Sequence, residues 1–106
     1  MGLFNWSYRS GDEQQLHGLA MRIAQRSLSE VLQSVTALTP QMSPAEARGY
    51  IRTRAAKVVT REIAAACAAD PRLRQADRAR LLSLVTDSLV AAVTEQRRMG
   101  RRTMAA

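Results

Sequence analysis

The chain has 106 residues, of which 46% are hydrophobic and 24% charged, and its formal net charge is +7. This length allows one domain, and the apolar content excludes an intrinsically disordered chain. The single cysteine, Cys67, excludes an intrachain disulfide and favours a reducing, cytoplasmic setting. No secretory signal is expected, and no window approaches the roughly 20 apolar residues that span a bilayer.

Aromatic residues are concentrated at the start of the chain. Phe4, Trp6 and Tyr8 are three of the four aromatic residues. Large aromatic side chains bury much apolar surface, so we expect residues 1–11 to form an aromatic extension that packs against another surface. The extension either anchors the protein to a partner or covers one end of the protein's own helices. Interface hot spots are enriched in tryptophan and tyrosine, which favours the anchor.

A first helix is predicted from Asp12 to about Leu38. The residues that fall on one side of it, at about 100° per residue, are Leu16, Leu19, Ala20, Ile23, Ala24, Val31, Val35 and Leu38. Small residues from Gly18 to Ser27 keep part of this face small and are expected to allow close helix packing. Pro40 ends the run, because the residue before a proline is disfavoured in the helical region.

The second helix has the strongest local start signal. Ser43, Pro44 and Glu46 form the pattern of a capping box with proline at the first helical position. The helix is expected to run to about Ala69, and Asp70-Pro71 stops it. Its predicted buried stripe contains Ala47, Ile51, Ala55, Val58 and Ala65. Glu62 falls in the same stripe, so either an arginine reaches this carboxylate or the stripe is rotated. Cys67 is expected to be a buried, inert thiol.

A third helix is predicted from about Gln75 to about Met99, with Gly100 as its C-terminal cap. Its predicted buried face contains Leu81, Leu82, Val85, Leu89, Ala92 and Val93. Three amphipathic helices with short connections predict an all-α fold. We expect an antiparallel three-helix bundle over residues 12–100, followed by a basic tail at residues 101–106.

The positive charge lies in the second half of the chain. Residues 1–39 are neutral overall, residues 40–69 hold five basic against two acidic groups, and residues 70–106 hold eight against four. Fifteen of the sixteen basic residues are arginine, whose planar fork suits carboxylates and phosphates. Two candidate basic surfaces follow. One is a stripe on the second helix, formed by Tyr50, Arg54, Lys57 and Arg61. The other is a cluster near the end of the third helix, formed by Arg97, Arg98, Arg101 and Arg102.

Each basic surface has two interpretations. The stripe is either a solvated face whose arginine stems cover apolar neighbours, or a track for a phosphate backbone. The terminal cluster either complements the negative end of the helix dipole or contacts nucleic acid or an acidic partner. No helix-turn-helix, metal-finger spacing or RNA-binding aromatic pattern accompanies them, so the basic signal is electrostatic only.

Catalytic chemistry has no candidate residues in this sequence. His17 is the only histidine, and we expect it to be partly exposed and non-catalytic. One histidine and one cysteine do not supply a zinc site unaided, and the five glycines are too scattered for a phosphate loop. We therefore expect no catalytic, cofactor-binding or metal-binding residues and no enzymatic activity.

The second and third predicted helices share one spacing of apolar and arginine residues, carried by Arg52, Val59, Ile63, Leu73, Arg78, Leu81, Leu82, Val85 and Leu89. With this spacing, residues 45–93 resemble the helical N-terminal domain of pilus-assembly and secretion ATPases. In that family a Gly-Pro-Leu element follows and leads to a nucleotide-binding domain, whereas Val90-Ala91-Ala92-Val93 stands here and no ATPase domain is expected. The resemblance implies a docking module without ATP hydrolysis.

The predicted function is that of a small, non-catalytic helical adaptor or assembly subunit. It is expected to bind a protein partner or larger complex through its aromatic N-terminus and its basic helices. The alternative is a nonspecific nucleic-acid-binding protein that uses the arginines of the second and third helices and the C-terminus. A third class is a peripheral membrane protein with an aromatic anchor, which alone would bind weakly. The sequence does not name the partner or the oligomeric state.

Overall fold

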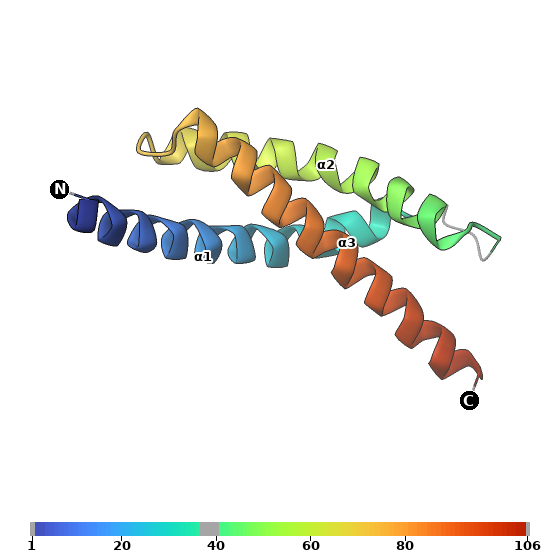
Figure 1. The fold of residues 1–106 in the computed structure, drawn as a ribbon. Coiled ribbons are helices and arrows are strands. Elements are labelled where there is room, and N and C mark those ends of the chain that lie inside the picture. Colours follow the sequence, from blue (N-terminus) through green and yellow to red (C-terminus); the bar gives the residue numbers. More distant parts are fainter. Residues whose placement is uncertain (1, 37–40, 106) are drawn as a thin grey trace.

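The computed structural model contains three long helices joined by two short connections (Figure 1). Helix α1 spans Gly2–Ser34, α2 spans Pro44–Ala69 and α3 spans Gln75–Ala105. The structure describes the backbone of residues 2–36 and 41–105, and the side chains of residues 13–36 and 41–99. Helix α2 runs back along α1, α3 turns back again, and each helix contacts the other two. The all-α, antiparallel three-helix bundle is therefore confirmed.

The predicted helix boundaries agree best for α2, which begins at Pro44 and ends at Ala69. Helix α1 begins at Gly2 instead of Asp12, so the backbone expected as an aromatic extension is helical from Gly2 onward. Helix α3 continues through Gly100 to Ala105, so Gly100 does not cap it, and the backbone of the basic tail is also helical. A glycine inside a helix costs about 1 kcal/mol relative to alanine and weakens a helix without necessarily ending it.

Side chains at the starts of α2 and α3 satisfy free backbone groups. The Ser43 hydroxyl accepts a hydrogen bond from the Glu46 amide at 3.1 Å, and the Glu46 carboxylate accepts one from the Ser43 amide at 3.4 Å. The predicted capping box of α2 is therefore confirmed. At the start of α3, the Asp77 carboxylate accepts a hydrogen bond from the Arg74 amide at 2.9 Å. This bond is the second half of a capping box, with arginine in place of the capping serine.

Ser43→Ala is expected to lower the free energy of unfolding by about 1 kcal/mol, because it leaves an amide of the first turn of α2 without its acceptor. Urea denaturation of wild type and variant measures this change. Ser43→Asp is the matched control, since aspartate retains an acceptor at the cap and should preserve most of the stability. Equal stability of Ser43→Ala and wild type would contradict a role for this cap.

Most buried residues of α2 and α3 recur at every fourth position. On α2 this row is Ala47, Ile51, Ala55, Val59, Ile63 and Cys67, and on α3 it is Leu81, Val85, Leu89 and Val93. Val58, Thr86 and Val90 are buried beside these rows. A helix has 3.6 residues per turn, so a row of every fourth residue slants around it. The sequence analysis placed the buried residues in a stripe parallel to the helix axis and predicted that Ala65 and Leu82 are buried. Both are exposed, so these two predictions were wrong. The predicted burial of Cys67 is confirmed.

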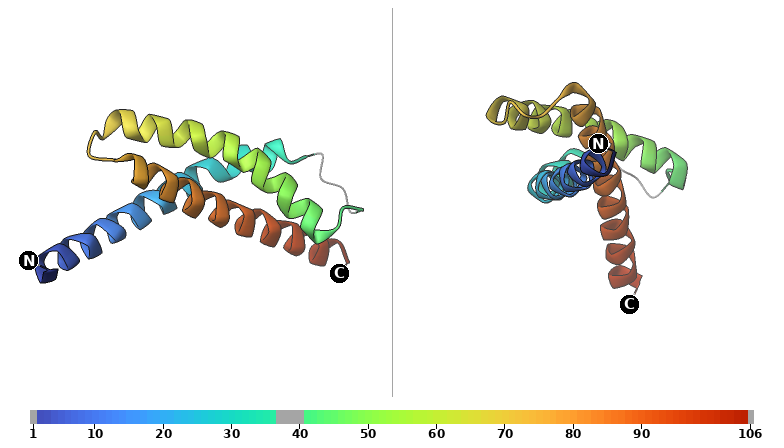
Figure 2. Two further views of the ribbon diagram at one scale, coloured as in Figure 1. Left: turned by 45° about the horizontal axis from the view of Figure 1, so that its top comes forward. Right: turned by 60° about the vertical axis from the view of Figure 1, so that its left-hand side comes forward.

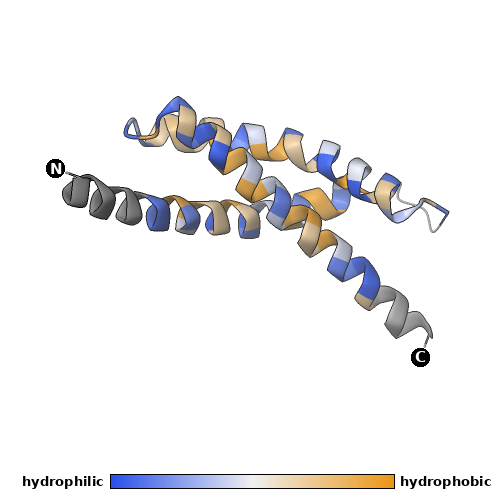
Figure 3. Ribbon diagram, viewed as in Figure 1, coloured by the Kyte–Doolittle hydropathy of each residue, from blue (hydrophilic) through white to orange (hydrophobic). Residues whose placement is uncertain are grey.

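Rows of every fourth residue on two helices pack into each other at a large crossing angle. A row of this kind also runs along α1, through Ile23, Ser27 and Val31, and continues to Val35 just after the helix. Helix α3 accordingly crosses α1 obliquely in the views of Figures 1 and 2. Hydrophobic residues occupy the facing sides of the helices (Figure 3). Ala20, Ala24 and Ser27 are buried on α1 and keep this face small, as predicted. Gly18 is exposed, and a Cβ built there would have no atom within 4 Å. Gly18 therefore takes no part in the close packing.

Candidate functional site

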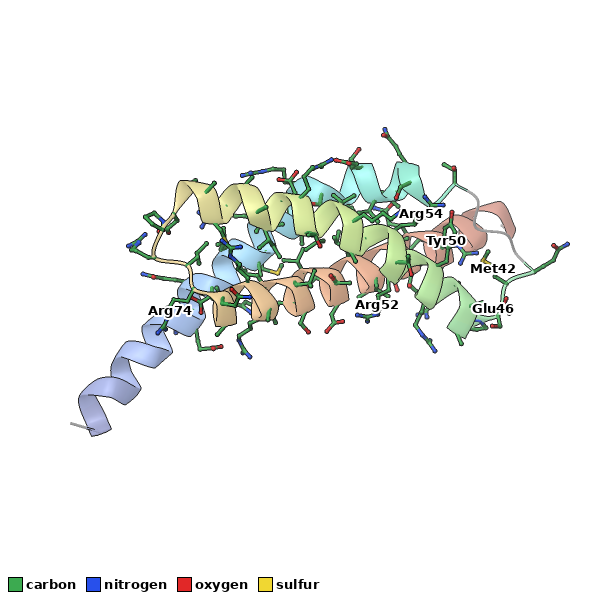
Figure 4. All side chains as sticks on the ribbon, turned by 90° about the horizontal axis from the view of Figure 1, so that it is seen from above. Met42, Glu46, Tyr50, Arg52, Arg54 and Arg74 are labelled. Carbon is green, nitrogen blue, oxygen red and sulfur yellow. The ribbon has the colours of Figure 1, made fainter. Side chains whose placement is uncertain are left out.

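The predicted basic stripe on α2 is partly engaged within the protein. The guanidinium carbon of Arg54 lies 5.2 Å from the centroid of the Tyr50 ring, which is a cation–π arrangement (Figure 4). Tyr50 is itself half-buried and packs against the core. Because one side of the ring holds Arg54 and the side chain is anchored in the core, Tyr50 offers only part of its surface to a partner.

Arg61 links α2 to α1. Its Nη1 and Nη2 atoms lie 2.9 and 2.6 Å from the two carboxylate oxygens of Glu30, and Nη2 also lies 3.1 Å from Glu62 Oε1. An arginine therefore reaches Glu62, which was the first of the two predicted alternatives. The hydrogen bonds from Arg61 lower the pKa of Glu30 and, in turn, raise the pKa of Arg61. Among the stripe residues, Arg54 and Lys57 therefore have no ion pair with a described residue, and only Arg54 of the two lies over an aromatic ring.

The C-terminal cluster is described for two of its four arginines. Arg98 Nη1 lies 3.6 Å from Glu95 Oε2, one helical turn earlier on α3, and both side chains are exposed. Arg97 is half-buried. The side chains of Arg101 and Arg102 lie outside the described residues, as do those of Phe4, Trp6 and Tyr8. An exposed ion pair such as Arg98–Glu95 contributes little to stability and exchanges readily with a competing anion.

Every described carboxylate has a partner within the chain. Arg52 and Arg80 pair with Asp87 and Glu13 at 2.8 and 2.6 Å, and Arg61 holds Glu30 and Glu62. Glu46 caps α2, and the remaining carboxylates pair with arginines close to them in sequence. Among residues 13–36 and 41–99, the exposed cations that have no ion pair are Arg22, Arg26, Arg48, Arg54, Lys57 and Arg78. The excess positive charge of the described part is therefore concentrated at these residues.

A groove of about 1160 Å³ lies between α1 and the α2–α3 connection. Its apolar lining comes from Leu16, Leu19, Ala66, Ala69 and Leu73. Its charged lining comes from Arg22, Arg26, Asp70, Arg72, Arg74 and Asp77, and Gln15 and Gly18 complete it. Figure 4 shows Arg74 beside α1, where the connection passes that helix. The groove thus combines an apolar floor with a mainly basic rim.

The two carboxylates of the groove hold the connection in place. Asp70 Oδ1 accepts hydrogen bonds from the amide and Nε of Arg72 at 3.1 and 3.0 Å, and Oδ2 accepts one from Nη2 at 3.1 Å. The hydrogen bonds from the Arg72 side chain and amide lower the pKa of Asp70. Asp77 bonds the Arg74 amide and lies 3.8 Å from Arg74 Nε. Both negative charges are therefore compensated locally, and the uncompensated charge of the groove comes from Arg22 and Arg26.

The sequence did not predict this groove, because its walls come from segments about fifty residues apart in the chain. One signal was present on α1. Gly18, Arg22 and Arg26 lie four residues apart, so they share one side of a helix, next to the apolar face. The sequence shows neither that these arginines lack an ion pair with another described residue nor where the α2–α3 connection lies.

His17 and Cys67, the candidates considered for chemistry, are far from forming a site. His17 is exposed on α1, and Cys67 is buried on α2. Within the described residues, no group of three histidine, cysteine or carboxylate side chains is placed to hold a metal ion.

No helix in the described part of the chain is long and apolar enough to cross a membrane. The chain matches no known protein family, no curated protein and no solved structure.

Proposed function

We propose that the protein is a small, non-catalytic helical adaptor or assembly subunit that binds another macromolecule. The observation that carries this proposal is the distribution of charge: each described carboxylate is already paired or caps a helix, whereas six exposed cations have no ion pair. Uncompensated arginines on a folded surface attract anionic partners and increase the rate of association.

The proposal places the first contact at Phe4, Trp6 and Tyr8 and the second at the basic helices. Helix α1 contains the first of these segments in its backbone, so a partner would meet these residues on a helix rather than on a loop. A docking role of this kind is also what the resemblance to the N-terminal domain of secretion ATPases implies. Engagement of Arg61 by Glu30 and Glu62 reduces the charge of the α2 stripe, which weakens the alternative of nonspecific nucleic-acid binding.

The proposal is tested by capturing partners from an extract of the native host with tagged wild type and with Trp6→Ala. The expected result is one protein that wild type retains and Trp6→Ala loses, while the two melting temperatures agree. Trp6 is the only tryptophan, so its fluorescence reports directly on its environment. Its emission should be that of exposed indole in the isolated protein and should shift to the blue in the complex.

Two outcomes would overturn this proposal. If Trp6→Ala lowers the melting temperature and the emission is already blue-shifted in the isolated protein, the aromatic segment covers the protein's own helices. If the protein instead binds duplex or single-stranded nucleic acid, the logarithm of its affinity should fall with the logarithm of salt concentration by about 0.9 per neutralised phosphate on duplex DNA. That result would establish the nucleic-acid alternative.

A further inference from the structure

We infer that the groove between α1 and the α2–α3 connection is a docking site for an acidic amphipathic helix of a partner protein. This inference rests on the proposed binding function and deepens it by naming a second surface and the chemistry of its occupant.

The floor offers apolar surface that the fold leaves partly exposed. Leu19, Ala66 and Leu73 pack against the hydrophobic core, yet each is only half-buried. Leu16 is 7% exposed and lies beneath this surface. Residues anchored in a core have few alternative positions, so a partner that covers them gains apolar burial at little cost in side-chain order. A helix with an apolar face is the kind of segment that docks in such grooves.

The rim selects the charge of that helix. Arg22 and Arg26 lie one helical turn apart on α1, both are exposed, and neither has an ion pair with another described residue. A guanidinium group binds a carboxylate through two parallel hydrogen bonds. Two such groups at this spacing match two carboxylates one turn apart on a facing helix. The carboxylates of Asp70 and Asp77 do not cancel this preference, because Arg72 and Arg74 already compensate them.

The wall on α1 leaves room for a close approach. Gly18 lies one turn before Arg22 and lines the groove, and the space where its side chain would stand is empty to at least 4 Å. Helices pack at distances of 8–10 Å depending on the side chains at the contact, so a residue without a side chain permits the shorter distance. A partner helix can therefore approach the α1 backbone at Gly18 while its carboxylates reach Arg22 and Arg26.

Other occupants fit less well. Nucleic acid binds through phosphate contacts and through bases stacked on aromatic rings, but among the described residues no aromatic side chain lines the groove and two carboxylates do. A second copy of this chain carries a net charge of +7, with residues 1–39 neutral and the rest positive, so none of its helices offers the excess of carboxylates that the rim attracts. An acidic helix satisfies both the apolar floor and the basic rim.

The test uses the intact protein and a labelled helical peptide of about 20 residues with leucine at the a and d positions, two glutamates one turn apart beside them, and alanine or glutamine elsewhere. Fluorescence anisotropy at low salt gives its dissociation constant. Gly18→Leu fills the groove wall, and Arg22→Gln/Arg26→Gln removes the rim charge. Each change is expected to weaken binding by at least about tenfold.

The chain supplies a matched control for each variant. Gly49→Leu makes the same substitution at an exposed helical glycine that also has open space around it but does not line the groove. Arg48→Gln/Arg78→Gln removes the same charge from α2 and α3, again at exposed described residues that have no ion pair and do not line the groove. Both controls should leave the affinity within about twofold of wild type, because neither changes the groove. Leucine is a better helix former than glycine, so Gly18→Leu should retain the fold, as circular dichroism can verify.

Several results would overturn the inference. If the peptide does not bind wild type, or if the control variants weaken binding as much as the groove variants, the groove does not select an acidic helix. If wild type forms dimers that Gly18→Leu dissociates, a second copy occupies the groove. If duplex DNA displaces the peptide and Gly18→Leu weakens DNA binding equally, the occupant is nucleic acid. If the peptide test fails but wild type still captures a partner that Trp6→Ala loses, this inference is overturned and the proposed function stands.

Discussion

Leu81→Ala is expected to lower the free energy of unfolding by about 2–5 kcal/mol, the largest effect of any substitution considered. Leu81 is 0% exposed and belongs to the hydrophobic core that all three helices share. Truncation removes the apolar contacts of three carbon atoms and leaves a cavity that a close-packed interior fills only in part. Domains of this size are stable by about 5–15 kcal/mol, so the variant approaches the limit of folding.

The neighbouring residue provides the control for this prediction. Leu82 is 37% exposed, lies on the same helix and carries the same side chain, so Leu82→Ala changes the intrinsic helix preference equally. Its cost should be under about 1.5 kcal/mol, because the side chain is already partly in water. Urea denaturation of the two variants gives the difference directly. Similar costs for both would mean that the buried row on α3 is not the one described.

Local signals in the sequence determined the parts of the fold that were predicted correctly. Ser43 and Glu46 interact over three residues, and a proline acts on its immediate neighbour, so both are readable without knowing the tertiary structure. Gly100 shows the limit of such signals. It was interpreted as a helix end, but its cost of about 1 kcal/mol relative to alanine does not by itself determine where the helix stops.

How the helices are rotated and placed against one another could not be predicted from local sequence patterns. A straight stripe and a slanted row contain almost the same residues near their middle and diverge toward the ends of a helix. Ile51 and Ala55 were therefore predicted correctly, whereas Ala65 was not. The pairing of Arg61 with Glu30 depends on how α1 and α2 are rotated against each other, and the groove depends on where the α2–α3 connection meets α1.

Gly18→Ala combined with Gly49→Ala is expected to raise the free energy of unfolding by about 2 kcal/mol, the second largest effect. Both residues lie inside helices, and a Cβ at either position would meet no atom within 4 Å. Alanine restricts the unfolded chain more than glycine does and prefers the helix by about 1 kcal/mol at each site. The two positions are on different helices without shared neighbours, so the gains should add.

Thermal denaturation of the single and double variants measures this gain, which corresponds to a rise in melting temperature of about 4–8 °C for each kcal/mol in a domain near this size. Ala65→Gly makes the reverse change at an exposed position inside α2 and should lower the stability by about 1 kcal/mol. If Gly18→Ala alone destabilises the protein while Gly49→Ala stabilises it, the space beside Gly18 is occupied in solution. That result would locate a contact of the isolated protein at the groove and would remove Gly18 as an open wall for a partner helix.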